Sequence, residues 1–275
     1  MKTNKKVLII AEAGINHNGS LKRAIKMIKI AKKIGADVIK FQTFVPSLVA
    51  TNKAKKADYQ KTKKSDNESQ LQMIKKLHLP LHSYITLQKE CKKERILFLS
   101  SPFDLTSAKY LIKMNVRQIK IPSGEITNYP LLKYLASKKI KIILSTGMSN
   151  LNEIRNAFNI LKKFGTSARN ISILHCNSSY PTPYKDVNLN VIETLDKEFK
   201  INIGYSDHTN GIITPIAAVA KGAMIIEKHL TLNKNLKGPD HSTSLNPKEF
   251  SLMVKYIRNT EVSLGNKKKK KQKAN

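Results

Sequence analysis

Two histidines lie at the ends of neighbouring apolar segments, where a side chain can face a site. His208 follows the segment 201–206, and His229 lies near the end of the segment 224–231. Imidazole is a good ligand for Mn, Fe, Co and Zn, so the pair could share a divalent cation. Structural histidines are the alternative. The chain has no H-E-x-x-H and no closely spaced cysteine pair, which argues against a structural zinc site.

Two lysines interrupt apolar segments in the same way. Lys40 lies in VIKFQ and Lys120 in QIKIPS. A buried ammonium without a partner costs free energy, so each lysine predicts an anion or a carboxylate beside it. Chance placement is the competing explanation in a chain with 44 lysines. Ser101, Ser123 and Ser206 are the last residues of similar segments. Their hydroxyls, together with the lysines, predict a site for a phosphate and a carboxylate, unless they are turn residues.

Two carboxylates complete this set. Glu12 and Glu125 lie at the ends of the first and fourth apolar segments. One of them could transfer a proton, and one could orient a water molecule on a metal ion. Ion pairing with the two lysines is the structural alternative, and the two roles can coexist.

The elements that carry these side chains are short apolar segments alternating with helical ones. Strands that are apolar almost throughout are typical of sheets covered on both faces. Strands are expected at 7–13, 37–43, 96–101, 117–123, 141–147, 171–176, 201–206 and 224–231. Helices are expected at 20–34, 69–77, 82–94, 104–114, 129–138, 150–164, 188–199, 212–221 and 247–263.

This alternation favours a (β/α)8 TIM barrel over an open, doubly wound sheet. A barrel directs all of its strand ends to one mouth, and nearly every expected strand ends in functional side chains. AEAGINHNG lacks the spacing of a dinucleotide-binding turn. The lysine-rich segment 44–68 follows the second strand on the same side and could act as a lid or a substrate loop. We expect the barrel to span 1–265 and the basic tail, 266–275, to be disordered.

Composition excludes several other classes. The chain carries 50 basic and 19 acidic residues, a net charge of +31 that suggests a nucleic-acid partner. However, only six of the basic residues are Arg, and no aromatic residues are interleaved with them as in single-strand binders. We therefore expect solvated helix faces and no nucleic-acid partner, with a basic nucleic-acid-binding protein as the non-enzyme alternative. No apolar run reaches the ~18 residues of a membrane span, and two distant cysteines suggest reduced thiols in a cytoplasmic protein.

Nine stretches of the chain resemble the sialic acid synthases, which comprise N-acetylneuraminate synthases and their legionaminic- and pseudaminic-acid relatives. They are AEAGINHNG, VIKFQTF, LSSPFD, IKIPSGEITNYPLL, IILSTGM, LHCNSSYPTPY, GYSDHT, IEKHLT and GPDHSTSLNP. They follow one another in family order and with family-like spacing over residues 6–264.

The resemblance implies a TIM barrel that condenses phosphoenolpyruvate with N-acetylmannosamine, giving N-acetylneuraminate and phosphate. It implies that His208 and His229 are ligands of Mn²⁺, with Mg²⁺ or Co²⁺ as alternatives. Matching positions hold phosphoenolpyruvate at Lys40, Ser101, Lys120, Ser123, Ser178 (an Asn in some members) and Ser206. Matching positions hold the sugar, the reacting aldehyde or water at Glu12, Gln42, Glu125, Tyr180 and Asp240, with Glu12 and Glu125 as the catalytic carboxylates.

Other interpretations remain open. One is a legionaminic or pseudaminic acid synthase acting on a diacetamido-trideoxyhexose. The segment 55–77 resembles the neuraminic and legionaminic branches more than the pseudaminic one, and it does not separate those two. Family members usually continue into an antifreeze-like domain that supplies an Arg across a homodimer, whereas this chain ends in LGNKKKKKQKAN. Three explanations stay open: the domain is a separate polypeptide, the barrel works without it, or activity is reduced. We expect a homodimer, and we expect the chain alone to bind phosphoenolpyruvate normally but the sugar poorly. A truncated, inactive barrel is a third interpretation, and the intact site residues argue against it.

Overall fold

Eight parallel strands form a nearly closed barrel in a computed structural model that describes residues 6–57, 60 and 68–265. Their order in the sheet is β3-β2-β1-β8-β7-β6-β5-β4, and β4 also packs beside β3. The strands are β1 (Leu8–Gly14), β2 (Val38–Thr43), β3 (Leu97–Pro102), β4 (Gln118–Ile121), β5 (Lys141–Ser145), β6 (Ile171–Cys176), β7 (Asn202–Asp207) and β8 (Ile225–His229). The expected (β/α)8 fold is thus confirmed.

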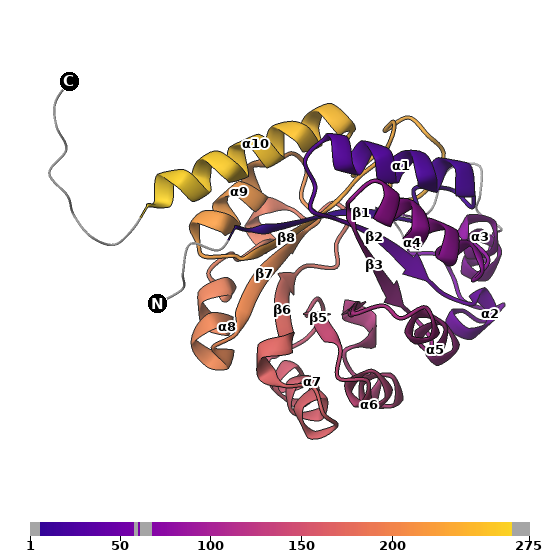
Figure 1. Ribbon diagram of the computed structural model, residues 1–275, viewed down its shortest axis with the longest axis horizontal. Coiled ribbons are helices and arrows are strands. Elements are labelled where there is room, and N and C mark those ends of the chain that lie inside the picture. The colour runs from indigo at the N-terminus through magenta and orange to yellow at the C-terminus, as the bar shows by residue number, and fades with distance from the viewer. Residues whose placement is uncertain (1–5, 58–59, 61–67, 266–275) are drawn as a thin grey trace, which may run out of the picture.

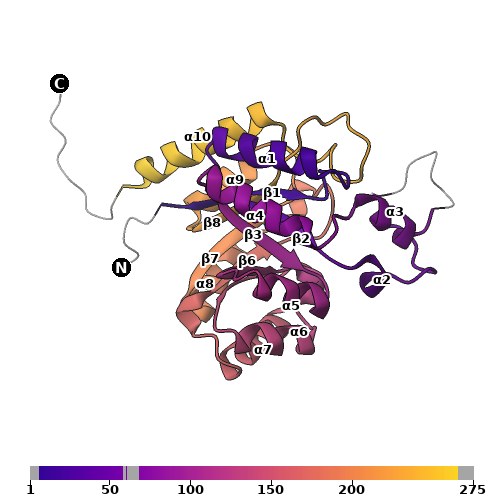
Figure 2. The same cartoon turned by 45° about the vertical axis from the view of Figure 1, so that its right-hand side comes forward.

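Helices surround the strands (Figure 1). They are α1 (Leu21–Lys33), α2 (Pro46–Val49), α3 (Gln70–Leu77), α4 (Ser83–Lys93), α5 (Leu105–Lys113), α6 (Tyr129–Ser137), α7 (Leu151–Lys163), α8 (Val191–Phe199), α9 (Ile213–Ala220) and α10 (Pro247–Leu264). Only the four-residue α2 was not expected, because a proline-initiated turn of this length has no helical period to recognise. In Figure 2, α2 and α3 project beyond the barrel.

Local sequence signals explain where several helices begin and end. The Asp104 side chain accepts a hydrogen bond from the backbone of α5, and Asn150 and Asn246 each form a capping box at the start of α7 and α10. Gly35 and Gly165 follow α1 and α7 with φ angles of +85° and +118°. These left-handed angles suit glycine and end each helix where the chain turns back to the next strand.

Strand alternation separates the apolar base of the barrel interior from its polar mouth. Ile10, Val38 and Ile225 belong to a small apolar cluster inside the barrel. Two residues further along the same strands, and therefore on the same face, the chain has Glu12, Lys40 and Glu227. The larger core, between sheet and helices, takes the alternate residues such as Ile9 and Ile39. Charged side chains are thereby held at the carboxyl ends of a rigid sheet.

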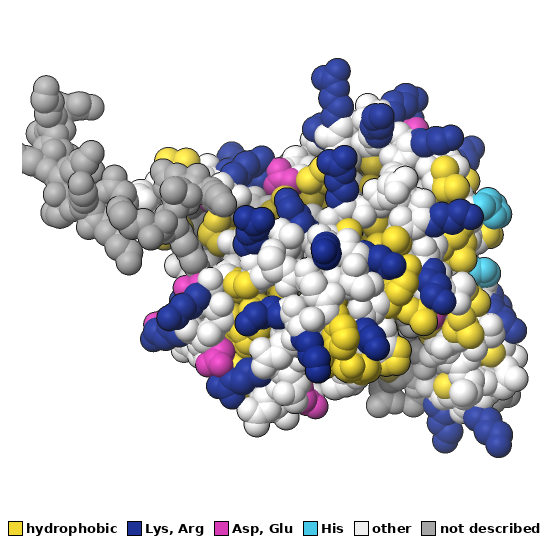
Figure 3. Space-filling model, turned by 60° about the horizontal axis from the view of Figure 1, so that its bottom comes forward, with side chains coloured by type: hydrophobic (Ala, Val, Ile, Leu, Met, Phe, Trp, Pro, Cys, Tyr) yellow, Lys and Arg dark blue, Asp and Glu magenta, His cyan; other side chains and the backbone are white. Residues whose placement is uncertain are grey.

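The surface carries many lysines and few acidic groups. Figure 3 shows lysine and arginine side chains scattered over one face of the molecule rather than gathered in one patch. Within the part of the chain that the structure describes, no helix is both long and apolar enough to cross a membrane. The predicted disordered tail, 266–275, lies outside the described residues.

Candidate active site

Every residue predicted for the site lines one cavity of about 520 Å³. The cavity opens among the carboxyl ends of the strands, as expected for a barrel enzyme. It brings together Glu12, Lys40, Gln42, Ser101, Lys120, Ser123, Glu125, Ser178, Tyr180, Ser206, His208, His229 and Asp240. Part of the segment 44–68 also reaches the cavity, through Phe44, α2 and Gln60, which agrees with the predicted substrate loop.

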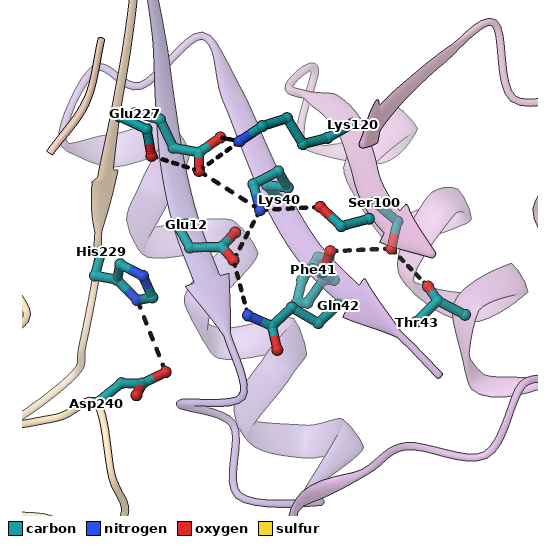
Figure 4. A network of polar contacts seen from close by, with 12 residues as sticks. Glu12, Lys40, Phe41, Gln42, Thr43, Ser100, Lys120, Glu227, His229 and Asp240 are labelled. Atoms are coloured by element: carbon teal, nitrogen blue, oxygen red, sulfur yellow. Dashed lines mark hydrogen bonds and ion pairs between the residues drawn. The ribbon is translucent and has the colours of Figure 1, made fainter. Parts of the chain in front are cut away.

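A network of buried charges forms the floor of this cavity (Figure 4). Lys120 Nζ donates to both carboxylate oxygens of Glu227, at 2.9 and 2.8 Å. Lys40 Nζ lies 2.8 Å from Glu12 Oε1 and 3.7 Å from Glu227 Oε1, and it donates to Ser101 Oγ at 3.2 Å. The expected carboxylate partners of the lysines are therefore present. Glu12 is one of them, but the partner of Lys120 is Glu227 rather than Glu125.

The network perturbs the pKa of each member. Burial alone would raise the pKa of Glu227, but Lys120 and Lys40 outweigh burial and hold this pKa at about 2. Burial would likewise lower the pKa of Lys40, but Glu12 and Glu227 keep it above its usual value. For Lys120 burial prevails over Glu227, and its pKa is lowered. An ammonium has three donors and Glu227 takes two from Lys120, so the floor can still bind an incoming anion.

The two histidines lie side by side above this floor, with ring centroids 5.5 Å apart. His208 Nδ1 lies 2.5 Å from the carbonyl oxygen of Asn177, and its Nε2 lies 2.8 Å from the hydroxyl of Tyr180. The contact with the Asn177 carbonyl requires a proton on Nδ1. The lone pair of neutral His208 is therefore on Nε2, the nitrogen next to the Tyr180 hydroxyl. His229 Nδ1 is buried, has no hydrogen-bond partner in the described residues and lies 4.0 Å from Asp240 Oδ2.

Two further carboxyl groups border the cavity in less charged surroundings. Burial, followed by the effect of Glu12, raises the pKa of Asp240 to about 6. Burial also raises the pKa of Glu125, whose carboxylate accepts a hydrogen bond from Asn128 at 2.6 Å. These groups bind protons more readily than an exposed carboxylate, as a proton-transfer residue requires.

The backbone after β5 approaches the site closely at Gly147. Its amide donates to Ser123 Oγ at 2.9 Å, and a Cβ added here would lie 2.5 Å from Ser178 Oγ. Any larger residue would therefore displace two of the predicted substrate-binding hydroxyls.

Glu227 and Ser145 were expected at strand ends facing the mouth, but they were not among the predicted site residues. Both line the cavity. A signal for Glu227 was present, because it precedes His229 by two residues in a buried strand and must share its face. Ser145 ends β5, and its buried hydroxyl has no hydrogen-bond partner among the described residues.

Together, fold and site define a (β/α)8 barrel with a charged cavity at the carboxyl ends of its strands, where two lysines and several hydroxyls lie beside two imidazoles. The family is shown by a model described as the NeuB family, which matches residues 27–269. The chain belongs to this family.

Characterised relatives agree with this assignment. The chain is 50% identical over 270 residues to an N,N'-diacetyllegionaminic acid synthase of Campylobacter jejuni, covering 98% of this chain and 81% of that protein. It is 45% identical over 264 residues to the enzyme of the same name from Legionella pneumophila, covering 95% and 74%. A crystal structure of an N-acetylneuraminic acid synthetase from Leptospira borgpetersenii superposes with a TM-score of 0.87 at 36% identity, covering 98% of this chain and 88% of that one.

The expectation of a sialic-acid-type synthase is confirmed by these relatives. The finer expectation, N-acetylneuraminate synthase, is less well supported than its alternative, because the two relatives with the higher identity are legionaminic acid synthases.

Proposed function

We propose that this enzyme condenses phosphoenolpyruvate with a 2,4-diacetamido-2,4,6-trideoxyhexose, giving N,N'-diacetyllegionaminic acid and phosphate. The observation that carries the proposal is the placement of two buried lysines and several hydroxyls beside two histidines in one cavity. Similarity to the two legionaminic acid synthases supports the choice of sugar.

Phosphoenolpyruvate would bind at the floor. Its phosphate and carboxylate need several positive or polar donors, which Lys40, Lys120 and the hydroxyls of Ser101, Ser123 and Ser206 can supply. Ser178 adds a further hydroxyl. Glu12 and Glu227 pair with the lysines in the absence of substrate. These ion pairs offset the desolvation cost of the buried ammonium groups before the anion binds.

The donor set also fits a divalent cation, most simply Mn²⁺, with Mg²⁺ or Co²⁺ as alternatives. His208 and His229 would hold it through imidazole nitrogens, and the buried Nδ1 of His229, which lacks a partner in the described chain, agrees with a missing ligand contact. The described residues contain no group of three ligating side chains placed around one ion, so water or substrate oxygens would complete the coordination. When bound, such a cation polarises the aldehyde oxygen of the sugar as a Lewis acid.

The protein's own groups would then position and protonate the reactants. The floor holds C3 of phosphoenolpyruvate facing the aldehyde carbon, and the new carbon–carbon bond forms between them. Water adds at C2, and the phosphate leaves. Glu125 and Glu12 lie where they can take up or deliver the protons of these steps, and Gln42, Tyr180 and Asp240 can hydrogen-bond to the sugar hydroxyls and amide.

The test is an assay of purified protein with phosphoenolpyruvate and Mn²⁺, following phosphate release and the mass of the product. The trideoxy sugar should give the nine-carbon acid faster than N-acetylmannosamine does. A preference for N-acetylmannosamine would favour the original expectation, N-acetylneuraminate synthase. The proposal also places a homodimeric enzyme in the cytoplasm, where phosphoenolpyruvate is formed, and light scattering can measure the dimer.

A further inference from the structure

One wall of the cavity is apolar. Binding of an anion by the charged floor does not require such a wall. Its members follow β2, belong to α2 and α3, or follow β3. They are Phe44, Leu48, Val49, Met73, Ile74 and Phe103. In Figure 2, α2 and α3 extend beyond the barrel. Residues of both helices line the cavity, which opens among the carboxyl ends of the strands.

The lower part of the wall is packed in place. Phe44 and Met73 are buried in a small apolar cluster with Ile15 and Leu77. The rings of Phe44 and Phe103 meet edge to face, with centroids 6.4 Å apart. A packed cluster presents a fixed surface, so a ligand would meet a preformed wall.

The upper part of the wall, formed by α2, is partly exposed. Leu48 is 57% exposed and Val49 is 36% exposed, and α2 buries none of its residues. Exposed apolar side chains that line a cavity beside a polar floor favour a ligand with a polar end and an apolar end.

The orientation of the sugar decides which of its atoms meet this wall. The aldehyde carbon must lie near the histidines and the phosphoenolpyruvate seat on the floor. If the rest of the open chain extends away from the floor along α2, its C4–C6 end meets the wall. N-acetylmannosamine has hydroxyls at C4 and C6, whereas the trideoxy sugar has an acetamido methyl at C4 and a methyl at C6.

We infer that this apolar wall, with Leu48 at its exposed edge, selects the sugar by the methyl groups at its C4–C6 end. The inference rests on the proposed function and adds the residues that set its specificity. A methylene-sized difference in an apolar pocket is worth about 10- to 200-fold in discrimination. Leu48→Gln should therefore reduce the preference for the trideoxy sugar over N-acetylmannosamine by about ten-fold.

The experiment compares kcat/KM for the two sugars at saturating phosphoenolpyruvate and Mn²⁺. Leu48→Gln should lose mainly the activity on the trideoxy sugar and keep the wild-type KM for phosphoenolpyruvate. Leu48→Met, which keeps the apolar surface, should retain the preference. Leu97→Gln is the matched control, because Leu97 is 59% exposed at the amino end of β3, away from the cavity. Leu97→Gln should leave kcat/KM unchanged for both sugars.

The outcomes separate the inference from the proposed function. Suppose that the wild type prefers the trideoxy sugar, but Leu48→Gln leaves this preference unchanged or lowers kcat/KM equally for both sugars. The wall then does not select the sugar, and only the inference is overturned. An unchanged preference with an altered mass in light scattering would overturn it too, and would assign Leu48 to a contact between copies. If the wild type prefers N-acetylmannosamine, both the proposed function and the inference are wrong.

Discussion

Lys120 and Glu227 bind each other across the full width of the barrel. They belong to β4 and β8, which stand opposite each other in the sheet order, yet Lys120 Nζ lies 2.8 Å from Glu227 Oε2. Both side chains are nearly completely buried. The pair therefore ties opposite walls together and holds a positive charge at the centre of the floor, where an anionic substrate would bind.

Replacing Lys120 should act mainly on phosphoenolpyruvate. Lys120→Ala removes one charge-assisted contact to the anion and leaves Glu227 with less compensation, so the KM for phosphoenolpyruvate should rise by about one to two decades. The KM for the sugar should change much less. Steady-state kinetics with each substrate varied in turn measure both effects. Lys141→Ala, at the exposed amino end of β5, is the control. Equal effects on both substrates would contradict the assignment of Lys120 to the anion.

Removing either histidine should abolish metal-stimulated turnover without unfolding the barrel. His229 Nδ1 makes no hydrogen bond in the described chain, so His229→Ala leaves no broken partner there. Titration calorimetry with Mn²⁺ should show loss of tight binding in His208→Ala and His229→Ala, while circular dichroism stays native. His82→Ala, outside the cavity, should behave as wild type. Near wild-type metal affinity in either site variant would show that its histidine is not a ligand.

Acid should destabilise the protein through His17. Burial, followed by the charge of Arg23, lowers the pKa of His17 to about 4 in the folded state, below an unfolded value near 6.5. The unfolded chain therefore binds this proton first as the pH falls. The stability contributed by neutral His17 is complete above about pH 6.5 and is lost progressively down to about pH 4, at a cost of roughly 3 kcal/mol.

His17→Asn tests this pH dependence. An Asn side-chain oxygen can replace Nδ1 as the acceptor for the backbone amide of Gly19. Urea unfolding between pH 4 and 7 should give a shallower loss of stability in the variant than in the wild type. The difference between the two free energies should be constant above pH 7. Parallel curves over the whole range would mean that His17 does not titrate in this window.

A buried ion pair between residues adjacent in sequence to the histidines should contribute far more to the stability of the fold than an exposed pair. Lys228 pairs with Asp207, and both side chains are fully buried between the sheet and its helices. Lys228→Met leaves a buried carboxylate uncompensated and should lower the free energy of unfolding by about 3–5 kcal/mol. Lys197→Met breaks the exposed pair with Glu193 on α8, where solvent screens both charges, and should leave the free energy of unfolding almost unchanged. Chemical denaturation measures both, and similar costs would refute the distinction.

The strands, most of the helices and the gathering of the predicted site residues in one cavity followed from the sequence by itself. Continuous apolar segments with polar ends indicated strands buried on both faces, and the positions of Lys40 and His229 near strand ends indicated that they face the mouth of a barrel. Parallel strands gather their carboxyl ends, so residues far apart in the chain could be assigned to one mouth. Motifs such as GYSDHT indicated the family, which the comparisons confirm.

Tertiary structure alone decided which of these side chains meet. Alternation defines the face of a strand but not what stands opposite it, because that depends on how the barrel closes and on strand stagger. Lys120 therefore reached Glu227 rather than Glu125, although 107 residues separate the pair in the chain. The tertiary structure also determined the apolar wall of the cavity. Leu48 and Val49 lie in a short helix without a helical period to recognise, so only the tertiary structure shows that they line the cavity.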